Sequence, residues 1–264
     1  MAKPNSIRSY LFALASPKGV QLNRNPRTSH RQHSYYSLGV CPSRFSATDA
    51  EIQNLNKYAD LVSDYLTEKA ASLQADVETR IQVLGLDKEN ASHFYEAFEE
   101  QFDEWCFSFP SLVRSSVVTS ACSLLEASLT DVCKHLDREF VSTISKRWPD
   151  FKDAGVRRAA CHLRQNFQIH LEDHKTWEHL LHHYHVRNAI VHAGGNLLLL
   201  SPEKRTALDS ALLGLKFPGL DEKDDKLRIP PPYPKKVIDD IASLWTALQG
   251  AFIDNSHIGP KYWP

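Results

Sequence analysis

The most apolar stretch of this 264-residue chain covers residues 112–146, and it limits the fold more than any other part of the sequence. Its apolar residues follow two neighbouring lines at helical spacing. These lines hold Ala121, Leu125, Val132 and Leu136, and beside them Cys122, Leu129 and Cys133. A helix that is apolar over so much of its circumference must be covered on several sides, so we predict that it lies at the centre of the fold.

Glu126 interrupts the second of these lines, between Cys122 and Leu129. An ionised carboxylate in apolar surroundings is costly unless a cation or hydrogen-bond donors pair with it. We therefore expect Glu126 to face a specific partner.

Helical spacing of apolar residues continues through most of the chain after residue 46. Thr48 and Glu51 have the spacing of a capping box, and Gly85 is a natural stop for the helix that they begin. One candidate strand, Leu227-Arg228-Ile229, lies in a Pro-rich passage. The expected helices cover residues 48–84, 87–108, 112–146, 153–170, 176–192 and 235–254, and a further helix opens at Ser201-Pro202. The sequence predicts an all-α bundle.

Charge is distributed unevenly along the chain. The formal net charge is −1, which provides no overall attraction for nucleic acid. Residues 1–46 carry no Asp or Glu, and their basic side chains are Lys3, Arg8, Lys18, Arg24, Arg27, Arg31 and Arg44. We predict a basic, disordered segment there. The alternatives are a start placed too early, an organellar transit peptide, and a basic arm that binds RNA phosphates.

The five cysteines are odd in number and include no Cys-x-x-Cys pair, which argues against a disulfide framework. Several fall in apolar helical patterns, where a free cysteine acts as a small apolar residue. This usage favours a reducing compartment, and no run of 18 or more apolar residues suggests a membrane span. We expect a cytoplasmic protein without a membrane partner.

The candidate chemistry lies in residues 181–195, near the end of an expected helix. Asn188 directly follows Arg187, and His192 comes five positions after the arginine, just before Gly194-Gly195. Five helical steps turn a side chain by about 140°, so Arg187 and His192 do not share a face, whereas Asn188 and His192 do. Asn188 also falls on an apolar stripe, so its amide should have a specific partner.

An arginine and a histidine together suit the cleavage of RNA. Neutral imidazole accepts a proton from a hydroxyl near pH 7, and a guanidinium stabilises charge that develops on a phosphate. RNA offers a nucleophile, the 2′-OH, beside a phosphate, and this route needs no metal. The spacing equally fits ordinary surface residues on a helix.

The pattern Arg187-Asn188-x-x-x-His192 resembles the R-x4-H signature of the HEPN superfamily. The stretch from Ser111 to Asp137, with its internal acidic residue, resembles an earlier helix of that bundle. The resemblance spans roughly residues 110–255. It implies a HEPN-like helical domain at residues 47–256, with a long variable insert before the last helix and a tail at 257–264.

The resemblance also implies a function. Many HEPN proteins are metal-independent endoribonucleases without a cofactor, which act as homodimers in phage defence, in toxin–antitoxin pairs or in RNA processing. Carried over to this chain, His192 is the base or acid, Arg187 binds the scissile phosphate and Asn188 orients a neighbour. Glu126 would pair with Arg187 or His192, and an ion pair that only fixes helix packing is the other interpretation of this residue.

Histidines and small basic groups surround the motif. His170 with His174, and His179 with His183, have the spacing of zinc ligands, but no third ligand is evident and a solvated helix face is the expected explanation. Three further candidates for the wall of an RNA groove are His182, His183 and His185. Small basic groups that could contact phosphate, or simply be solvated, are Arg157-Arg158, Arg164 and Lys235-Lys236.

Motifs of several other enzyme classes are absent from the sequence, including the Gly-rich phosphate loops and the GxSxG nucleophile elbow. The competing interpretation is a non-catalytic helical binding or assembly module. In that case Arg187 and His192 should be buried and paired within one subunit.

Overall fold

Helices make up most of the computed structural model, which describes residues 42–142, 144–223 and 225–254. The helices are α3 (Pro42–Leu84), α4 (Lys88–Glu96), α5 (Glu99–Asp103), α6 (Phe109–Glu139), α7 (Gly155–Phe167), α8 (Trp177–Ala193), α9 (Pro202–Leu215) and α10 (Tyr233–Asp254). One π-helical turn and three 3₁₀ turns lie between them: η3 (Glu104–Ser108), η4 (Trp148–Asp150), η5 (Leu171–Asp173) and η6 (Leu197–Leu199). The predicted all-α class is confirmed. The predicted disordered segment 1–46 lies outside this description up to residue 41, but its last five residues, 42–46, belong to α3. The predicted tail 257–264 also lies outside the described residues.

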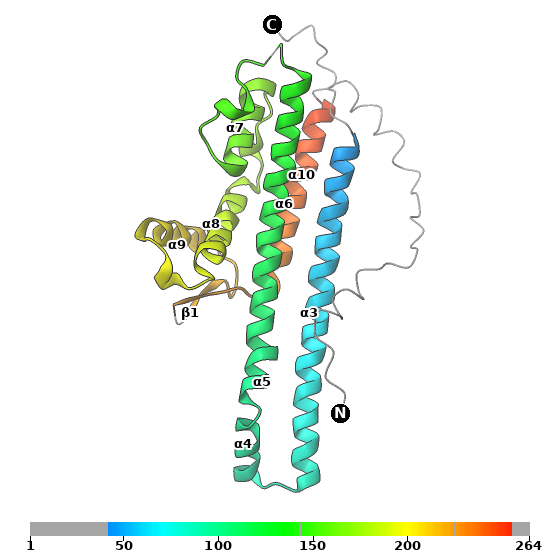
Figure 1. Cartoon of the computed structure of the whole chain (residues 1–264), viewed down its shortest axis with the longest axis vertical. Helices are drawn as coiled ribbons and strands as arrows, with labels where there is room; N and C mark the ends of the chain where they lie inside the picture. Colours follow the sequence, from blue (N-terminus) through cyan, green and yellow to red (C-terminus); the bar gives the residue numbers. More distant parts are fainter. Residues whose placement is uncertain (1–41, 143, 224, 255–264) are drawn as a thin grey trace, which may run out of the picture. The chain divides into compact units, whose positions relative to one another are not determined.

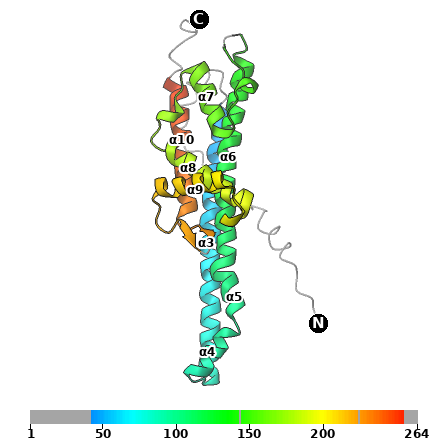
Figure 2. The same cartoon turned by 90° about the vertical axis from the view of Figure 1, so that its left-hand side faces the viewer.

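Helix α6 packs against α3, α7, α8 and α10, as its two apolar lines predict. In Figures 1 and 2, α3 runs antiparallel beside α6, and α10 runs parallel to α6. The seven residues of the two predicted lines are all buried. Each fully buried large apolar side chain contributes about 1.5–3 kcal/mol to folding, so the central position of α6 follows from its composition.

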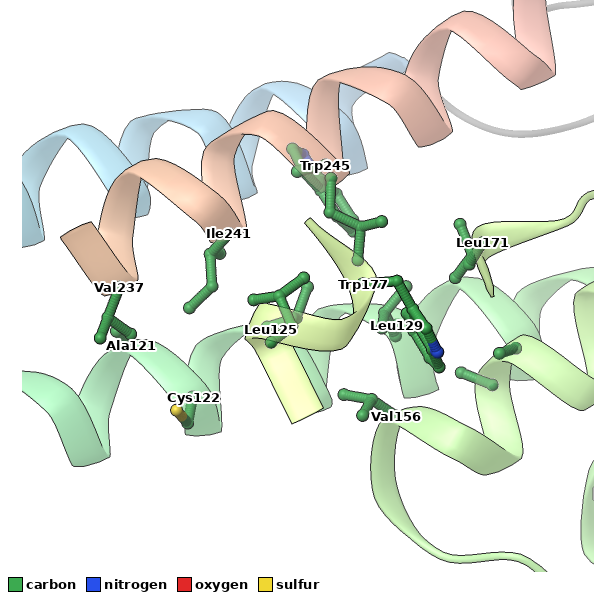
Figure 3. Packing of buried hydrophobic residues seen from close by; sticks show 14 of the residues in the cluster. Ala121, Cys122, Leu125, Leu129, Val156, Leu171, Trp177, Val237, Ile241 and Trp245 are labelled. Atoms are coloured by element: carbon green, nitrogen blue, oxygen red, sulfur yellow. The ribbon is translucent and has the colours of Figure 1, made fainter. Parts of the chain in front are cut away.

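Helix α10 covers one side of α6 with the apolar stripe that the sequence predicts. Figure 3 shows Val237 of α10 beside Ala121 of α6. One turn further along, Ile241 of α10 points toward Leu125. The stripe residues of α10 are all buried, and they are Val237, Ile238, Ile241, Leu244, Trp245, Leu248 and Phe252.

Helix α3 begins six residues before the predicted cap. Phe45 is 2% exposed, and its ring lies 5.1 Å from that of Trp245 and 5.6 Å from that of Phe252. Thr48 is therefore an interior residue of the helix, and its hydroxyl donates to the Arg44 carbonyl at 3.3 Å. Burial of Phe45 outweighs the local capping signal, so the prediction of a helix start at Thr48 is wrong.

Two other predicted helices differ from the structure by more than three residues at an end or in their continuity. The single helix expected over 87–108 is divided into α4, α5 and η3. The helix expected over 112–146 ends at Glu139, because Phe140 leaves the helical conformation with φ −113° and ψ 29°. None of the described helices combines the length and the apolar character that a membrane crossing requires.

The chain between α8 and α10 forms α9 and a β-hairpin, both on one side of α6 (Figure 1). Strand β1 (Asp221–Lys223) pairs antiparallel with β2 (Lys226–Arg228). The strand predicted at 227–229 is thus confirmed within one residue, whereas β1 was not predicted. Asp, Glu and Lys are poor strand formers, so β1 exists because it pairs with β2 and not because of its own propensity.

Candidate active site at the end of helix α8

Two glycines end α8 directly after the motif, as predicted. Gly194 has φ 58° and Gly195 has φ 78°, a region that residues with a Cβ rarely adopt. The Gly194 N–H donates to the Ile190 carbonyl at 2.8 Å, and the Gly195 N–H donates to the Ala189 carbonyl at 3.2 Å. His192 therefore lies in the last turn of the helix.

The β-hairpin holds the chain that leaves this turn. The Leu197 N–H donates to the Asp225 carbonyl at 2.8 Å, and the Leu227 N–H donates to the Gly195 carbonyl at 2.9 Å. These backbone bonds tie the segment after His192 to the insert. The last turn of α8 is thus held by the helix before it and by the β-hairpin bonds after it.

The structure brings Arg187 and Asn188 together. Nη1 of Arg187 donates to Oδ1 of Asn188 at 3.0 Å. This contact supplies the specific partner that the amide of Asn188 was expected to have. Asn188 and His192 are four residues apart, about 40° around the helix. The guanidinium itself is half-buried, and its charge acts on the pKa values of Cys122 and Tyr184. The Nε of Arg187 is buried and has no partner in the described part of the chain.

His192 itself is exposed. No hydrogen bond or ion pair joins its ring to another described residue. Its imidazole is therefore open to a ligand from solvent, unlike that of His183 in the same helix.

Glu126 lies on α6, half-buried, against the first residue of α7. Its Oε1 is 3.2 Å from the point where a Cβ of Gly155 would stand. Among the described residues, no ion pair joins Glu126 to Arg187 or to His192. Glu126 and Arg187 nevertheless act on the same two groups, because both charges influence the pKa values of Cys122 and Tyr184.

Tyr184 anchors α8 to α6 beside the motif, a contact that the sequence did not predict. Its hydroxyl donates to the Cys122 carbonyl at 2.7 Å. Burial raises the pKa of the Tyr184 hydroxyl, and Cys122 and Glu126 raise it further. Burial also raises the pKa of the Cys122 thiol to about 12. Both groups stay protonated at neutral pH, so Tyr184 acts as a hydrogen-bond donor that positions the helix.

His183 belongs to a buried polar network and does not line a groove, which corrects one of the predictions. Its ring is 0% exposed. Nε2 of His183 lies 3.0 Å from Oδ2 of Asp240, and Nδ1 lies 2.8 Å from the Tyr233 hydroxyl. Lys236 donates to the other oxygen of Asp240 at 2.6 Å. The i, i+4 spacing of Lys236 and Asp240 was a visible signal for their pairing, but nothing local indicated the histidine between α8 and α10.

The protonation of this network follows from the groups that surround it. Burial raises the pKa of Tyr233 well above its usual value, so the hydroxyl stays protonated. Burial acts to raise the pKa of Asp240, but hydrogen bonds from His183 and Lys236 outweigh it and lower that pKa. The carboxylate only accepts, so Nε2–H of His183 donates to Asp240, and Nδ1 accepts from Tyr233. Burial lowers the pKa of His183, which fits this neutral form.

The remaining histidines of the segment have different surroundings. Nδ1 of His179 lies 3.8 Å from the same Asp240 carboxylate. His182 packs against Gly214 of α9, so closely that a side chain at Gly214 would meet its ring. His185 is half-buried. Within the described ranges, no group of three or more His, Cys, Asp or Glu side chains is arranged to hold a metal ion.

The small basic groups are likewise separated by the structure. Arg164 pairs with Glu172 at 2.9 Å, and Arg158 stacks on the ring of Trp148. Lys235 donates to Asn56, and Lys236 is bound to Asp240. Arg157 is exposed, and no described residue accepts a hydrogen bond from it or pairs with it.

Comparison with known proteins adds no further assignment. No protein-family model, no curated protein and no solved structure matches this chain.

Proposed function

We propose that this chain is a HEPN-like, metal-independent endoribonuclease with its active site at the end of α8. The observation that carries the proposal is the arrangement around Asn188. Its amide holds the guanidinium of Arg187 at 3.0 Å and shares a helix face with the exposed, unpaired imidazole of His192. A cation for phosphate and a free imidazole near the end of one helix are the groups that cleavage next to a 2′-OH requires.

The proposed reaction is a transesterification. A histidine takes the proton of the 2′-OH as its oxygen attacks the adjacent phosphorus, and the P–O5′ bond breaks. The departing O5′ receives a proton from a histidine in its acid form, which leaves a 2′,3′-cyclic phosphate and a 5′-OH end. Arg187 stabilises the charge on the phosphate oxygens. Asn188 positions Arg187, and Glu126 contributes a negative charge near the same guanidinium.

A cleavage assay with EDTA present tests this proposal. Wild-type protein is expected to cleave a fluorescent RNA oligonucleotide to products with 2′,3′-cyclic phosphate ends, identified by mass spectrometry. His192→Ala should lose at least 100-fold in rate, the lower range for removing a general acid or base. His170→Ala, which removes an exposed histidine outside α8, should retain full activity. Equal cleavage by wild type and His192→Ala, or cleavage of an all-2′-deoxy strand, contradicts the proposal.

We further propose that the active form is a homodimer, in which two motifs share one cleft. Large apolar side chains next to the motif are exposed, which suits contact with a second copy: Val191 is 46%, Leu198 71% and Leu199 69% exposed. Sedimentation should show a dimer, and Leu198→Asp with Leu199→Asp should yield a monomer with reduced cleavage. A fully active monomer would contradict this part of the proposal.

A defence or toxin role is the proposed biological setting, with an antitoxin or defence protein as the partner. Expression in bacteria should arrest growth for wild type and not for His192→Ala. The competing proposal, a non-catalytic helical module, has less support because His192 is exposed and unpaired within the described chain. That module would become the preferred interpretation if a folded dimer binds RNA without cleaving it.

A further inference from the structure

A pocket of about 530 Å³ lies where α3, α6, the turn η3 and the segment that leads into α10 meet. Helices α3 and α6 run side by side (Figures 1 and 2), and both contact η3 and α10. Pockets for small organic molecules have volumes of about 300–1,000 Å³, so this one is large enough for such a ligand. Neither Arg187 nor His192 lines it, so it is separate from the candidate active site.

Apolar side chains from three elements line this pocket. Leu66 of α3 and Val117 of α6 are buried, and Trp105 of η3 is half-buried. The Trp105 ring meets the rings of Tyr65 and Phe109 edge-on, with centroids 6.4 Å and 5.0 Å away. These contacts hold the indole in one orientation, and they make it a fixed aromatic wall for the apolar part of a ligand.

The backbone around the pocket also has a fixed and unusual form. Residues Glu104–Ser108 form a π-helical turn, which is a rare conformation that is often found at functional sites. A second wall holds Pro231, Pro232 and Pro234. Proline rings restrict φ, so this wall has few alternative conformations. A pre-formed pocket loses less conformational entropy when a ligand binds.

Arg114 of α6 brings a positive charge to the pocket. Its side chain is half-buried, and Nη1 donates to the Ile229 carbonyl at 3.2 Å. A guanidinium has further N–H donors, and no carboxylate of the described chain pairs with this one. Burial lowers the pKa of Arg114, because the enclosed charge loses hydration. A bound anion would supply the missing counter-charge.

Lys235, at the start of α10, adds a second cation to the lining. Its Nζ donates to the neutral amide oxygen of Asn56 at 3.2 Å, and no described carboxylate pairs with it. Among the described lining residues, Asp60 is the only acidic one, and it forms no ion pair with Arg114 or Lys235. The lining thus carries two positive charges and one negative charge, which favours an anionic ligand.

We propose that this pocket binds a small organic carboxylate with an aromatic body. The carboxylate accepts hydrogen bonds from the remaining N–H groups of Arg114, and the body packs against Trp105 and Leu66. Lys235, which is exposed, adds electrostatic attraction where the pocket meets solvent. Binding here is independent of the proposed RNA cleavage, because no residue of the candidate active site lines the pocket.

A ligand-observed NMR titration with 3-phenylpropionate tests the proposal, and its neutral amide, 3-phenylpropanamide, is the matched probe. Wild-type protein should bind the carboxylate with a Kd of about 5 mM or lower, an affinity that suits a ligand of this size. Arg114→Gln should weaken this binding by about 10- to 100-fold, the effect of losing a hydrogen bond between charged groups. The variant should then bind the carboxylate and the amide equally weakly.

Three further variants separate an effect of charge from an effect of folding. Lys235→Gln leaves the contact of Arg114 with Ile229 in place and should weaken binding by about 2- to 5-fold, the range for an exposed charge. Asp60→Asn should tighten binding, because it removes the negative charge from the lining. Lys57→Gln is the control, since Lys57 is an exposed residue of α3 outside the lining, and it should bind like wild type.

Cys106 shows where the ligand binds. Its free thiol is half-buried and lines the pocket, whereas the half-buried thiol of Cys161 lies on α7 outside it. Bound 3-phenylpropionate should slow the reaction of Cys106 with iodoacetamide and leave the reaction of Cys161 unchanged. Peptide mass spectrometry measures both rates in one sample.

Several results would overturn the carboxylate site. Wild-type protein could fail to bind 3-phenylpropionate, or could bind the carboxylate and the amide equally well. A folded Arg114→Gln, checked by circular dichroism, could bind like wild type. If Arg114→Gln does not fold, unchanged binding by Lys235→Gln together with unprotected Cys106 rejects the site. Weaker binding by Lys235→Gln, with Lys57→Gln unchanged and Cys106 protected, supports it.

Discussion

Oδ1 of Asn188 accepts a hydrogen bond from Nη1 of Arg187, the residue directly before it on α8, at 3.0 Å. Consecutive helix residues point about 100° apart, so the contact requires the long arginine side chain to bend toward the asparagine. The amide of Asn188 thus holds one end of the guanidinium, while packing encloses its Nε.

Replacing this amide should misplace the charge without removing it. Asn188→Ala is expected to lower kcat/KM for RNA by about 10- to 100-fold, because small displacements of a catalytic group have effects of this size. Asn188→Asp should retain the contact, but its carboxylate would form an ion pair with the guanidinium and weaken the attraction for phosphate, which mainly raises KM. Steady-state kinetics on one oligonucleotide distinguishes the two variants. Wild-type kinetics in Asn188→Ala would show that the contact has no catalytic role.

Removing one hydroxyl from the buried network should destabilise the fold. Tyr233→Phe leaves Nδ1 of His183 buried without its donor, which costs about 1–3 kcal/mol of unfolding free energy. Tyr58→Phe is the control, because Tyr58 is 47% exposed, and its effect should stay within about 0.5 kcal/mol. Urea denaturation followed by circular dichroism measures both. Equal effects of the two variants would contradict the assigned network.

The free energy of unfolding should fall as the pH drops below about 6.5, the ordinary pKa of histidine. Burial lowers the pKa of His183 in the folded chain, so between that value and about 6.5 the unfolded chain binds more protons. The stabilisation that neutral His183 provides is fully present above a pH of about 6.5. It is lost as the pH falls through the lower pKa that His183 has in the folded chain. The pKa is lowered in the same direction, with burial as the first cause, for His162, His174 and His185.

Urea denaturation at pH 7.5, 6.0 and 5.0 measures this dependence. His183→Gln should be less stable than wild type at pH 7.5 and should lose less stability between pH 7.5 and pH 5.0. A wild-type protein that becomes more stable on acidification over this interval would contradict the burial of neutral histidines.

The glycine that begins α7 should not tolerate a side chain. Gly155 has φ 55°, and an added Cβ would lie 3.2 Å from Oε1 of Glu126. Gly155→Ala is expected to lower the unfolding free energy by about 1–2 kcal/mol, the usual penalty for a positive φ. Gly250→Ala on α10 is the control, because its Cβ would meet nothing within 4 Å. The control should be stabilising by up to about 1 kcal/mol, since alanine favours a helix.

Local periodicity predicts the elements of this fold because helix formation and termination depend on near neighbours. The central place of α6, the stripe of α10 and the end of α8 at Gly194 all follow from spacing. Boundaries shifted where a distant contact outweighed a local signal, as when burial of Phe45 moved the start of α3 to Pro42. Strand β1 required its partner and had no signal of its own.

The sequence by itself determined the residue types of the candidate site and their order along α8. The tertiary structure alone decided their surroundings, since residues of one type have the same local signature. His183 is buried against Asp240, 57 residues away, whereas His192 on the same helix is exposed. Arg164 is paired, whereas Arg157 is not. Burial and pairing depend on which distant helices pack against each face, and these contacts decide which of several similar side chains remains available for a ligand.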